Sequence, residues 1–172
     1  MKFFFSLLIS FFLFIGSSLA DESIRFININ YIVNNSDAGV SLNKIIKNKT
    51  KKIESDLKDL AQKIEEKKNK IVSQKNILKK EDLDNLVKVY ENEVQKFNEI
   101  RKKMRDEFNS FNIKSKKKII DLLNPLITNY LKKESIQMLL QKDKIVFGND
   151  TLDITKEILK LFDDKHKKIQ FE

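Results

Sequence analysis

The side chains that could carry out catalysis are few and poorly placed for it. The 172-residue chain has one His, His166, in a run of charged residues, and it has no Cys. The carboxylate pairs Glu65-Glu66, Glu81-Asp82 and Asp163-Asp164 are adjacent in sequence, so on a helix the two members of a pair point in different directions. No phosphate-binding loop, nucleophile elbow or metal-ligand spacing occurs. We therefore predict that the protein is not an enzyme and uses no cofactor or metal.

Basic residues dominate the middle of the chain. Residues 42–120 contain 23 Lys and Arg against 13 Asp and Glu, whereas residues 21–41 and 121–172 together contain 10 against 12. A solvent-exposed helix surface would explain why so many of these residues are charged. It would not explain why the positive charges outnumber the negative ones. A net positive surface concentrates anionic partners, which here would be acidic unfolded chains or anionic lipid headgroups. The predicted binding residues are Lys67, Lys68, Lys70, Arg101, Lys102, Lys103, Arg105, Lys114, Lys116, Lys117 and Lys118.

Two long helices are needed to position these basic residues. Seam positions, most of them apolar, recur at steps of three and four from about residue 40 to residue 78, with one stutter near residue 55, and again from residue 87 to residue 130. Such spacing is typical of a heptad seam between paired helices. A polar stretch separates the two seams, so we predict an antiparallel coiled-coil hairpin arm over residues 40–134, roughly 55–60 Å long. Pro125 lies inside the second seam and predicts a kink or a break into two helices.

Aromatic residues strengthen the second seam. Phe97, Phe108 and Phe111 fall on it at helical spacing, so most of them should pack between the two helices. The alternative is that some of these rings face a surface that binds a partner. Both readings place the aromatic residues of the arm beside its basic residues.

The first twenty residues have the pattern of a secretory signal peptide. Lys2 supplies the positive start, an apolar run extends from Phe3 to Ile15, and Ala20 is a small residue before the expected cleavage point. The apolar run is shorter than the roughly 20 residues that a membrane-spanning helix needs, so we favour cleavage over a retained anchor. The mature chain, residues 21–172, would then be exported to the periplasm. Export separates it from nucleic acid, so no nucleic-acid partner is predicted.

Short strands should form a small body at the base of the arm. Residues 23–29 are rich in Ile and Phe, and as a strand they would place Ile27 and Ile29 on one face and Ile24 and Phe26 on the other. Asn30 is a plausible cap for a helical turn after the strand. Residues 135–140 and 144–147 predict two further strands. Asp153 predicts the start of a final helix.

The predicted fold is therefore α+β, with one domain in residues 21–172. Residues 21–39 and 135–172 form a small β body of three strands, and residues 40–134 form the arm. Such a body has a poor core and open strand edges, which oligomerisation usually remedies. We predict a homo-oligomer in which strands from several chains complete a shared sheet or barrel. The predicted core residues of this body are Ile24, Phe26, Ile27, Ile29, Ile136, Met138, Leu140, Ile145, Phe147, Ile154, Ile158 and Leu161.

The sequence resembles the Skp/OmpH family of periplasmic chaperones. The resemblance lies in the opening run Ile24-Arg-Phe-Ile-Asn-Ile-Asn-Tyr-Ile-Val followed by Ser36-Asp-Ala-Gly, and in the closing run from Ile145 to Ile158 with its Asp153-Ile154-Thr155 helix start. A hairpin of family-like length lies between these runs. The family is also linked to lipopolysaccharide binding, which no particular residues of this sequence carry.

The resemblance implies a homotrimer. Strands of three chains would form a small β-barrel body, and three arms would enclose a cavity that holds unfolded outer-membrane proteins without ATP and prevents their aggregation. Two other functions stay open on the residues alone. One is a non-enzymatic coiled-coil adaptor of the cell envelope, and the other is a protein that docks on an anionic membrane through its basic arm.

Overall fold

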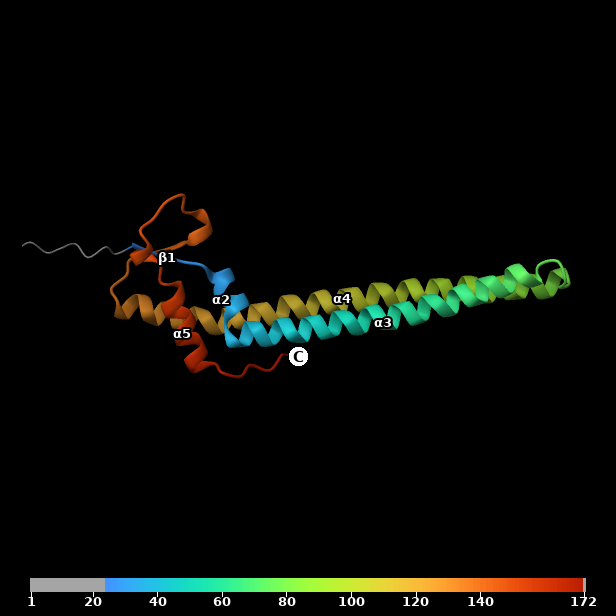
Figure 1. The fold of residues 1–172 in the computed structure, drawn as a ribbon, viewed down its shortest axis with the longest axis horizontal. Helices are drawn as coiled ribbons and strands as arrows, with labels where there is room; N and C mark the ends of the chain where they lie inside the picture. Colours follow the sequence, from blue (N-terminus) through green and yellow to red (C-terminus); the bar gives the residue numbers. More distant parts are fainter. Residues whose placement is uncertain (1–23, 172) are drawn as a thin grey trace, which may run out of the picture.

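The computed structural model describes residues 24–171, and the predicted signal peptide lies outside this range. Figure 1 shows a long two-helix arm attached to a small body, which confirms the predicted α+β fold. The elements in chain order are β1 (Ile24–Ile27), α2 (Ile29–Asn35), α3 (Asp37–Gln74), α4 (Lys80–Lys133), β2 (Met138–Gln141), the 3₁₀ turns η1 (Lys142–Lys144) and η2 (Asp150–Leu152), and α5 (Thr155–Lys165).

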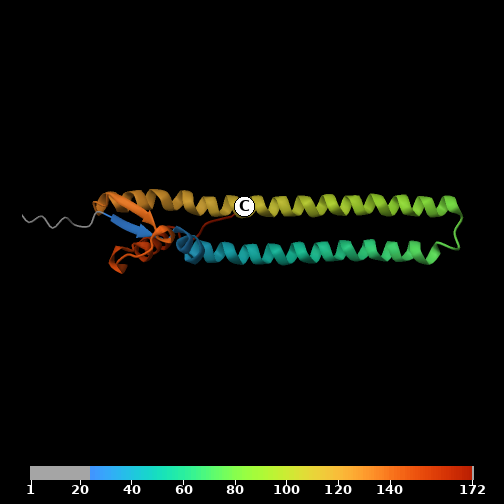
Figure 2. The ribbon, with the colours of Figure 1, turned by 90° about the horizontal axis from the view of Figure 1, so that it is seen from above.

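Helices α3 and α4 form the arm. They run antiparallel and lie side by side along the whole of α3 (Figure 2). Helix α3 has 38 residues, which at about 1.5 Å per residue gives about 57 Å, as predicted. It begins where the Ser36 side chain accepts a hydrogen bond from the Gly39 backbone N–H at 3.1 Å. Asp37 in its first turn lies favourably at the positive end of the helix dipole.

Helix α4 continues without interruption through Pro125. The predicted break into two helices is therefore wrong. Proline removes one helical hydrogen bond, but Leu123 and Ile127 on either side of it are buried. Packing of these two side chains against the body holds the helix together despite the lost bond.

Strands β1 and β2 pair in parallel, with Ile24 opposite Met138 and Ile27 opposite Gln141. The two strands come from opposite ends of the chain, so their pairing closes the body around the root of the arm. Phe26 also forms an isolated parallel bridge with Asp153, and its carbonyl accepts a hydrogen bond from the Ile154 N–H at 3.0 Å.

The predicted third strand at residues 144–147 is not formed, and the sheet within residues 24–171 has two strands. The chain turns at η1 instead, where the Ile145 N–H donates to the Lys142 carbonyl at 3.2 Å. A strand needs a neighbour for its backbone hydrogen bonds, and in this single chain the segment has none. Val146 and Phe147 are almost wholly exposed, at 105% and 92%.

Two element boundaries also differ from prediction. Helix α2 is capped by Asn28 rather than Asn30, because the Asn28 side chain accepts from the Tyr31 N–H at 2.8 Å. Strand β2 starts at Met138 rather than residue 135, because Ser135 has a left-handed backbone (φ 53°) that ends α4. The Ile136 N–H then bonds back to the Leu131 carbonyl at 2.9 Å, as in a Schellman turn.

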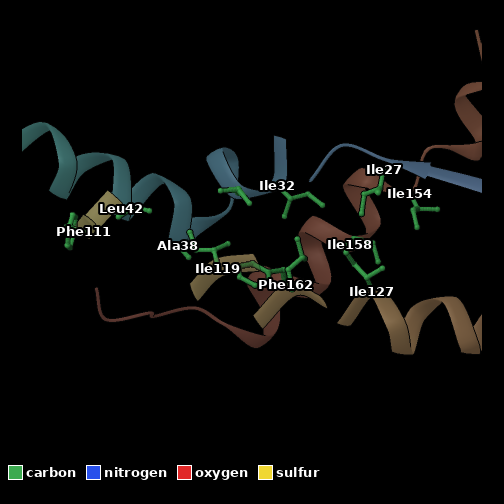
Figure 3. Packing of buried hydrophobic residues seen from close by; sticks show 12 residues of the cluster. Ile27, Ile32, Ala38, Leu42, Phe111, Ile119, Ile127, Ile154, Ile158 and Phe162 are labelled. Carbon is green, nitrogen blue, oxygen red and sulfur yellow. The ribbon is translucent and has the colours of Figure 1, made fainter. Parts of the chain in front are cut away.

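The apolar core lies where α2, α5 and the roots of α3 and α4 meet (Figure 3). Ile32, Ile119, Ile158 and Phe162 are completely buried there. By contrast, no residue from 43 to 110 is buried, so the arm beyond its root has a half-buried seam and no closed core. Most of the stability of the chain must therefore come from the junction of arm and body.

Candidate functional site

The seam of the arm opens into a groove near its middle, between α3 and α4. This mid-arm groove has a volume of about 390 Å³. Its lining combines apolar side chains with lysines and glutamates, so it suits an apolar side chain next to a charged one. It is shallow and open to water, unlike a catalytic cleft. It is lined by Leu60, Lys63, Ile64, Glu66, Lys67, Glu93, Lys96, Phe97 and Ile100.

A second groove of about 240 Å³ lies closer to the body. Its floor includes Ile53, Met104 and Phe108. The Lys49 Nζ stands 4.6 Å from the centroid of the Phe111 ring, a favourable cation–π distance. The aromatic residues of the second seam thus pack between the helices and also contribute to these grooves. The packing between the helices is confirmed for Phe111, which is buried, and a partner-binding role of the aromatic residues stays a prediction.

Most of the predicted basic residues already have a partner. Lys67 pairs with Glu93 across the two helices, and the Arg101 guanidinium lies 5.8 Å from the Phe97 ring centroid. The remaining ion pairs are formed within one helix, at distances from 2.7 to 3.9 Å. They join Lys68 to Glu65, Lys103 to Glu107, Arg105 to Asp106 and Lys117 to Asp121. Exposed pairs of this kind are weak, so a stronger anionic partner can replace the carboxylate.

A smaller group of the predicted basic residues is unpaired. Lys70, Lys102, Lys114 and Lys116 are exposed, and their ammonium groups make no ion pair within the described residues. Three of them, Lys102, Lys114 and Lys116, lie on α4 and Lys70 lies on α3, where Lys58 and Lys63 are also exposed and without an ion pair within the described residues. Lys118, the last predicted residue, donates a hydrogen bond to the Gln170 carbonyl at 2.8 Å.

The predicted body core is only partly buried in one chain. Phe26, Ile27, Ile154 and Ile158 are buried as predicted, whereas Ile29, Ile136 and Ile145 are half-buried. The remaining five are exposed in the single chain, and their predicted burial between several chains stays a prediction. These exposed residues are Ile24, Met138, Leu140, Phe147 and Leu161.

The Asp153-Ile154-Thr155 helix start is a structural joint. The Asp153 carboxylate accepts from the Thr155 N–H at 2.9 Å, from the Thr155 hydroxyl, and from the Lys142 ammonium at 2.5 Å. The Thr155 hydroxyl in turn accepts from the Asn28 N–H at 2.9 Å. Burial alone would raise the pKa of Asp153, but the bonds from Lys142 and Thr155 outweigh it and lower that pKa. The hydrogen bond to Asp153 raises the pKa of Lys142.

A wider groove between α4 and α5 was not predicted from the sequence. It has a volume of about 590 Å³ and includes Leu126, Tyr130 and Leu161 among its lining residues. Burial, followed by the charges of Glu134 and Glu157, raises the pKa of Tyr130. The groove exists because α5 packs across α4, and no periodicity in either helix signals that crossing.

No group of three or more His, Cys, Asp and Glu side chains within residues 24–171 is arranged to hold a metal ion. In the same range, no helix combines the length and the apolar character needed to cross a bilayer.

Comparison with known proteins agrees with this architecture. A search of curated proteins finds no match. A crystal structure of a candidate outer membrane chaperone (OmpH-like) from Caulobacter crescentus is similar in fold, with a TM-score of 0.81 and 14% sequence identity, over 89% of this chain and 90% of that one. The family model described as outer membrane protein (OmpH-like) matches residues 23–162. Since the match spans most of the sequence, the chain belongs to the OmpH-like family.

Proposed function

We propose that this protein is a periplasmic holdase chaperone, which binds unfolded outer-membrane β-barrel proteins without ATP and prevents their aggregation. The observation that carries the proposal is the structure of the arm. Open grooves lie between α3 and α4, and their lining combines apolar side chains with lysines, of which Lys63 and Lys96 make no ion pair within the described residues. An unfolded chain with apolar and acidic residues can bind at many such places, each of them weakly.

The exposed apolar residues of the body support the proposal that it acts as a homotrimer. Met138 is half exposed and Phe147 is 92% exposed. Large apolar side chains left in water usually mark an interface. Strands of three chains would cover these residues and would pair the open edges of the two-stranded sheet. The three arms would then surround one cavity.

Weak multiple contacts also explain release without a nucleotide. Each groove and each lysine contributes little, so the bound chain detaches locally and rebinds quickly. Folding into the membrane is the lower free-energy state for a barrel protein, and it removes the client from the equilibrium. Lipopolysaccharide or anionic membrane contact through the α4 lysines is an additional proposal that rests on the same charges.

An aggregation assay tests the proposal. An unfolded outer-membrane barrel protein is diluted from urea into buffer with residues 21–172 of this chain, and light scattering is followed. We expect full suppression of scattering at three chains per client molecule. Unsuppressed scattering at that ratio contradicts the holdase function. Salt-sensitive binding to anionic vesicles without suppression would favour the membrane-docking alternative, and binding of one folded envelope protein alone would favour the adaptor.

A further inference from the structure

The chain does not stop at α5 but continues as an extended segment along the root of the arm. We call residues 167–171 the strap. Figures 1 and 2 show it leaving the end of α5 and running back toward the arm, close to α4. The turn into the strap is fixed at His166, whose N–H donates to the Phe162 carbonyl at 2.8 Å and whose ring lies 5.1 Å from the Phe162 ring centroid.

Alternate residues of the strap pack against the arm root. Ile169 and Phe171 are half-buried and pack against the apolar core cluster, whereas Gln170 between them is exposed. This alternation is that of a β-strand, in which every second side chain points to the same face. The Gln170 carbonyl accepts the hydrogen bond from the Lys118 ammonium at 2.8 Å. The strap is therefore a strand-like peptide bound on a helical surface.

The attachment of the strap is weak. It consists of two half-buried apolar side chains and a hydrogen bond from an exposed lysine, and such bonds contribute little in water. The strap also lies beyond the part that the family model matches, which ends at residue 162. The family-model match thus includes the part of α4 beneath the strap and does not include the strap itself.

The surface beneath the strap has the same chemistry as the grooves farther along the arm. It joins the apolar core at the arm root to the Lys118 ammonium. One turn away on α4, Lys114 is exposed and has no ion pair within the described residues. A strand of an unfolded barrel protein offers what the strap offers, because it alternates apolar and polar residues, and its acidic side chains could also reach Lys114.

We propose that the strap is an internal placeholder on a client-binding site at the root of the arm, and that a strand-like segment of the client displaces it. This inference rests on the proposed function. Because only the strap-free fraction of the chain can bind there, a strap docked about nine-tenths of the time weakens client binding about tenfold. Removal of the strap should therefore tighten client binding by the same factor of about ten.

Three variants of the mature chain test the placeholder. They are a chain ending at Lys165, the double variant Ile169→Ser/Phe171→Ser, and the control Gln170→Ser, whose replaced side chain is exposed and whose backbone carbonyl is kept. The dissociation constant of a fluorescently labelled unfolded barrel protein is measured for each. We expect about tenfold tighter binding for the first two, and binding equal to the parent chain for the control.

Two measurements follow the strap itself. The chain has no Trp, so Phe171→Trp provides a single emission signal, which should shift to longer wavelength when a Trp-free client is added. A labelled peptide of residues 166–172 should also bind the chain ending at Lys165, and it should be displaced by client. This peptide assay reports on the site even if removal of the strap lowers stability.

The possible failures are distinguishable. If the parent chain binds client but the strap variants bind equally well and the indole emission of the Phe171→Trp variant does not move, the placeholder is overturned and the holdase proposal stands. If no variant binds client, the proposed function is overturned and the inference falls with it.

Discussion

Gly39 and Val33 are in direct backbone contact at the start of the arm. A Cβ atom added to Gly39 would lie 2.1 Å from the Val33 carbonyl oxygen, far inside any allowed contact. The contact places α2 against the first turn of α3, next to the buried Ala38 and Leu42. This contact is thus where the arm leaves the body.

Gly39→Ala should destabilise the chain strongly. The added methyl group meets backbone rather than a flexible side chain, so α2 or α3 must shift. We expect a loss of about 2–4 kcal/mol in the free energy of unfolding, measured by urea denaturation. Ser41→Ala, on the exposed side of the same helix turn, serves as the control and should change it by less than about 0.5 kcal/mol. Equal stability of the two variants would contradict the contact.

Ser115→Ala should be neutral or stabilising. The Ser115 Oγ is buried on α4, and it has no hydrogen-bond partner within the described residues. Removal of an unsatisfied buried hydroxyl removes its desolvation cost. Ile119→Ala, one turn further and completely buried, should instead cost about 2–4 kcal/mol. Thermal unfolding compares the two, and a loss for Ser115→Ala as large as for Ile119→Ala would show that the hydroxyl has a partner.

Asp153 should make the chain sensitive to acid. Its pKa in the folded chain is below the ordinary 3.8, so the stability it contributes is present above about pH 4 and is lost as the pH falls through the lowered folded value. Asp153→Asn should therefore flatten the acid side of the curve of stability against pH.

Asp163 provides a matched control of opposite sign. Burial raises its pKa, although its carboxylate accepts a hydrogen bond from the Asp37 N–H at 2.9 Å. Its ionised form therefore costs stability at neutral pH, and that cost disappears as the pH falls below the raised value. Asp163→Asn should steepen the loss of stability in acid. A flatter curve for Asp163→Asn than for Asp153→Asn would contradict both assignments.

The unpaired lysines of α4 should matter more for client capture than the paired ones. Lys102→Gln, Lys114→Gln and Lys116→Gln combined should weaken binding of an unfolded barrel protein on the order of tenfold at low salt. Combined replacement of Lys68, Lys103 and Lys117 by Gln removes the same charge from residues already paired with carboxylates and should weaken binding less. Fluorescence anisotropy measures both.

Added salt tests whether the difference in client binding between the two triple lysine variants is electrostatic. Screening between exposed charges is strong at physiological ionic strength, where the Debye length is about 8 Å. The difference between the two triple variants should therefore shrink as salt is added. An equal loss for both sets at every salt concentration would show that only net charge matters, and not the pairing of lysines with carboxylates along the arm.

The arm could be predicted from the sequence because helical periodicity is local. The spacing of three or four residues between seam positions can be recognised from neighbouring residues alone. The length of the two arm helices and their antiparallel pairing follow from that spacing. The exception was Pro125, where the local rule predicted a kink or a break into two helices, and no break occurs. The buried Leu123 and Ile127 on either side overrode it, and that burial depends on the distant α2 and α5.

The body was less predictable because strands depend on partners. Ile24–Ile27 finds its neighbour more than a hundred residues away, while residues 144–147 have the composition of a strand and no neighbour in the chain. The grooves were also hidden from sequence reasoning. The mid-arm groove depends on how far α3 and α4 separate, and the α4–α5 groove depends on a crossing of helices.

The central claim is that three copies of this chain hold one unfolded client between their arms. Native mass spectrometry of residues 21–172, mixed with an unfolded outer-membrane barrel protein, tests it most directly. The account predicts a free species of three chains and a complex of three chains with one client. A single chain or a dimer with no client attached would contradict it.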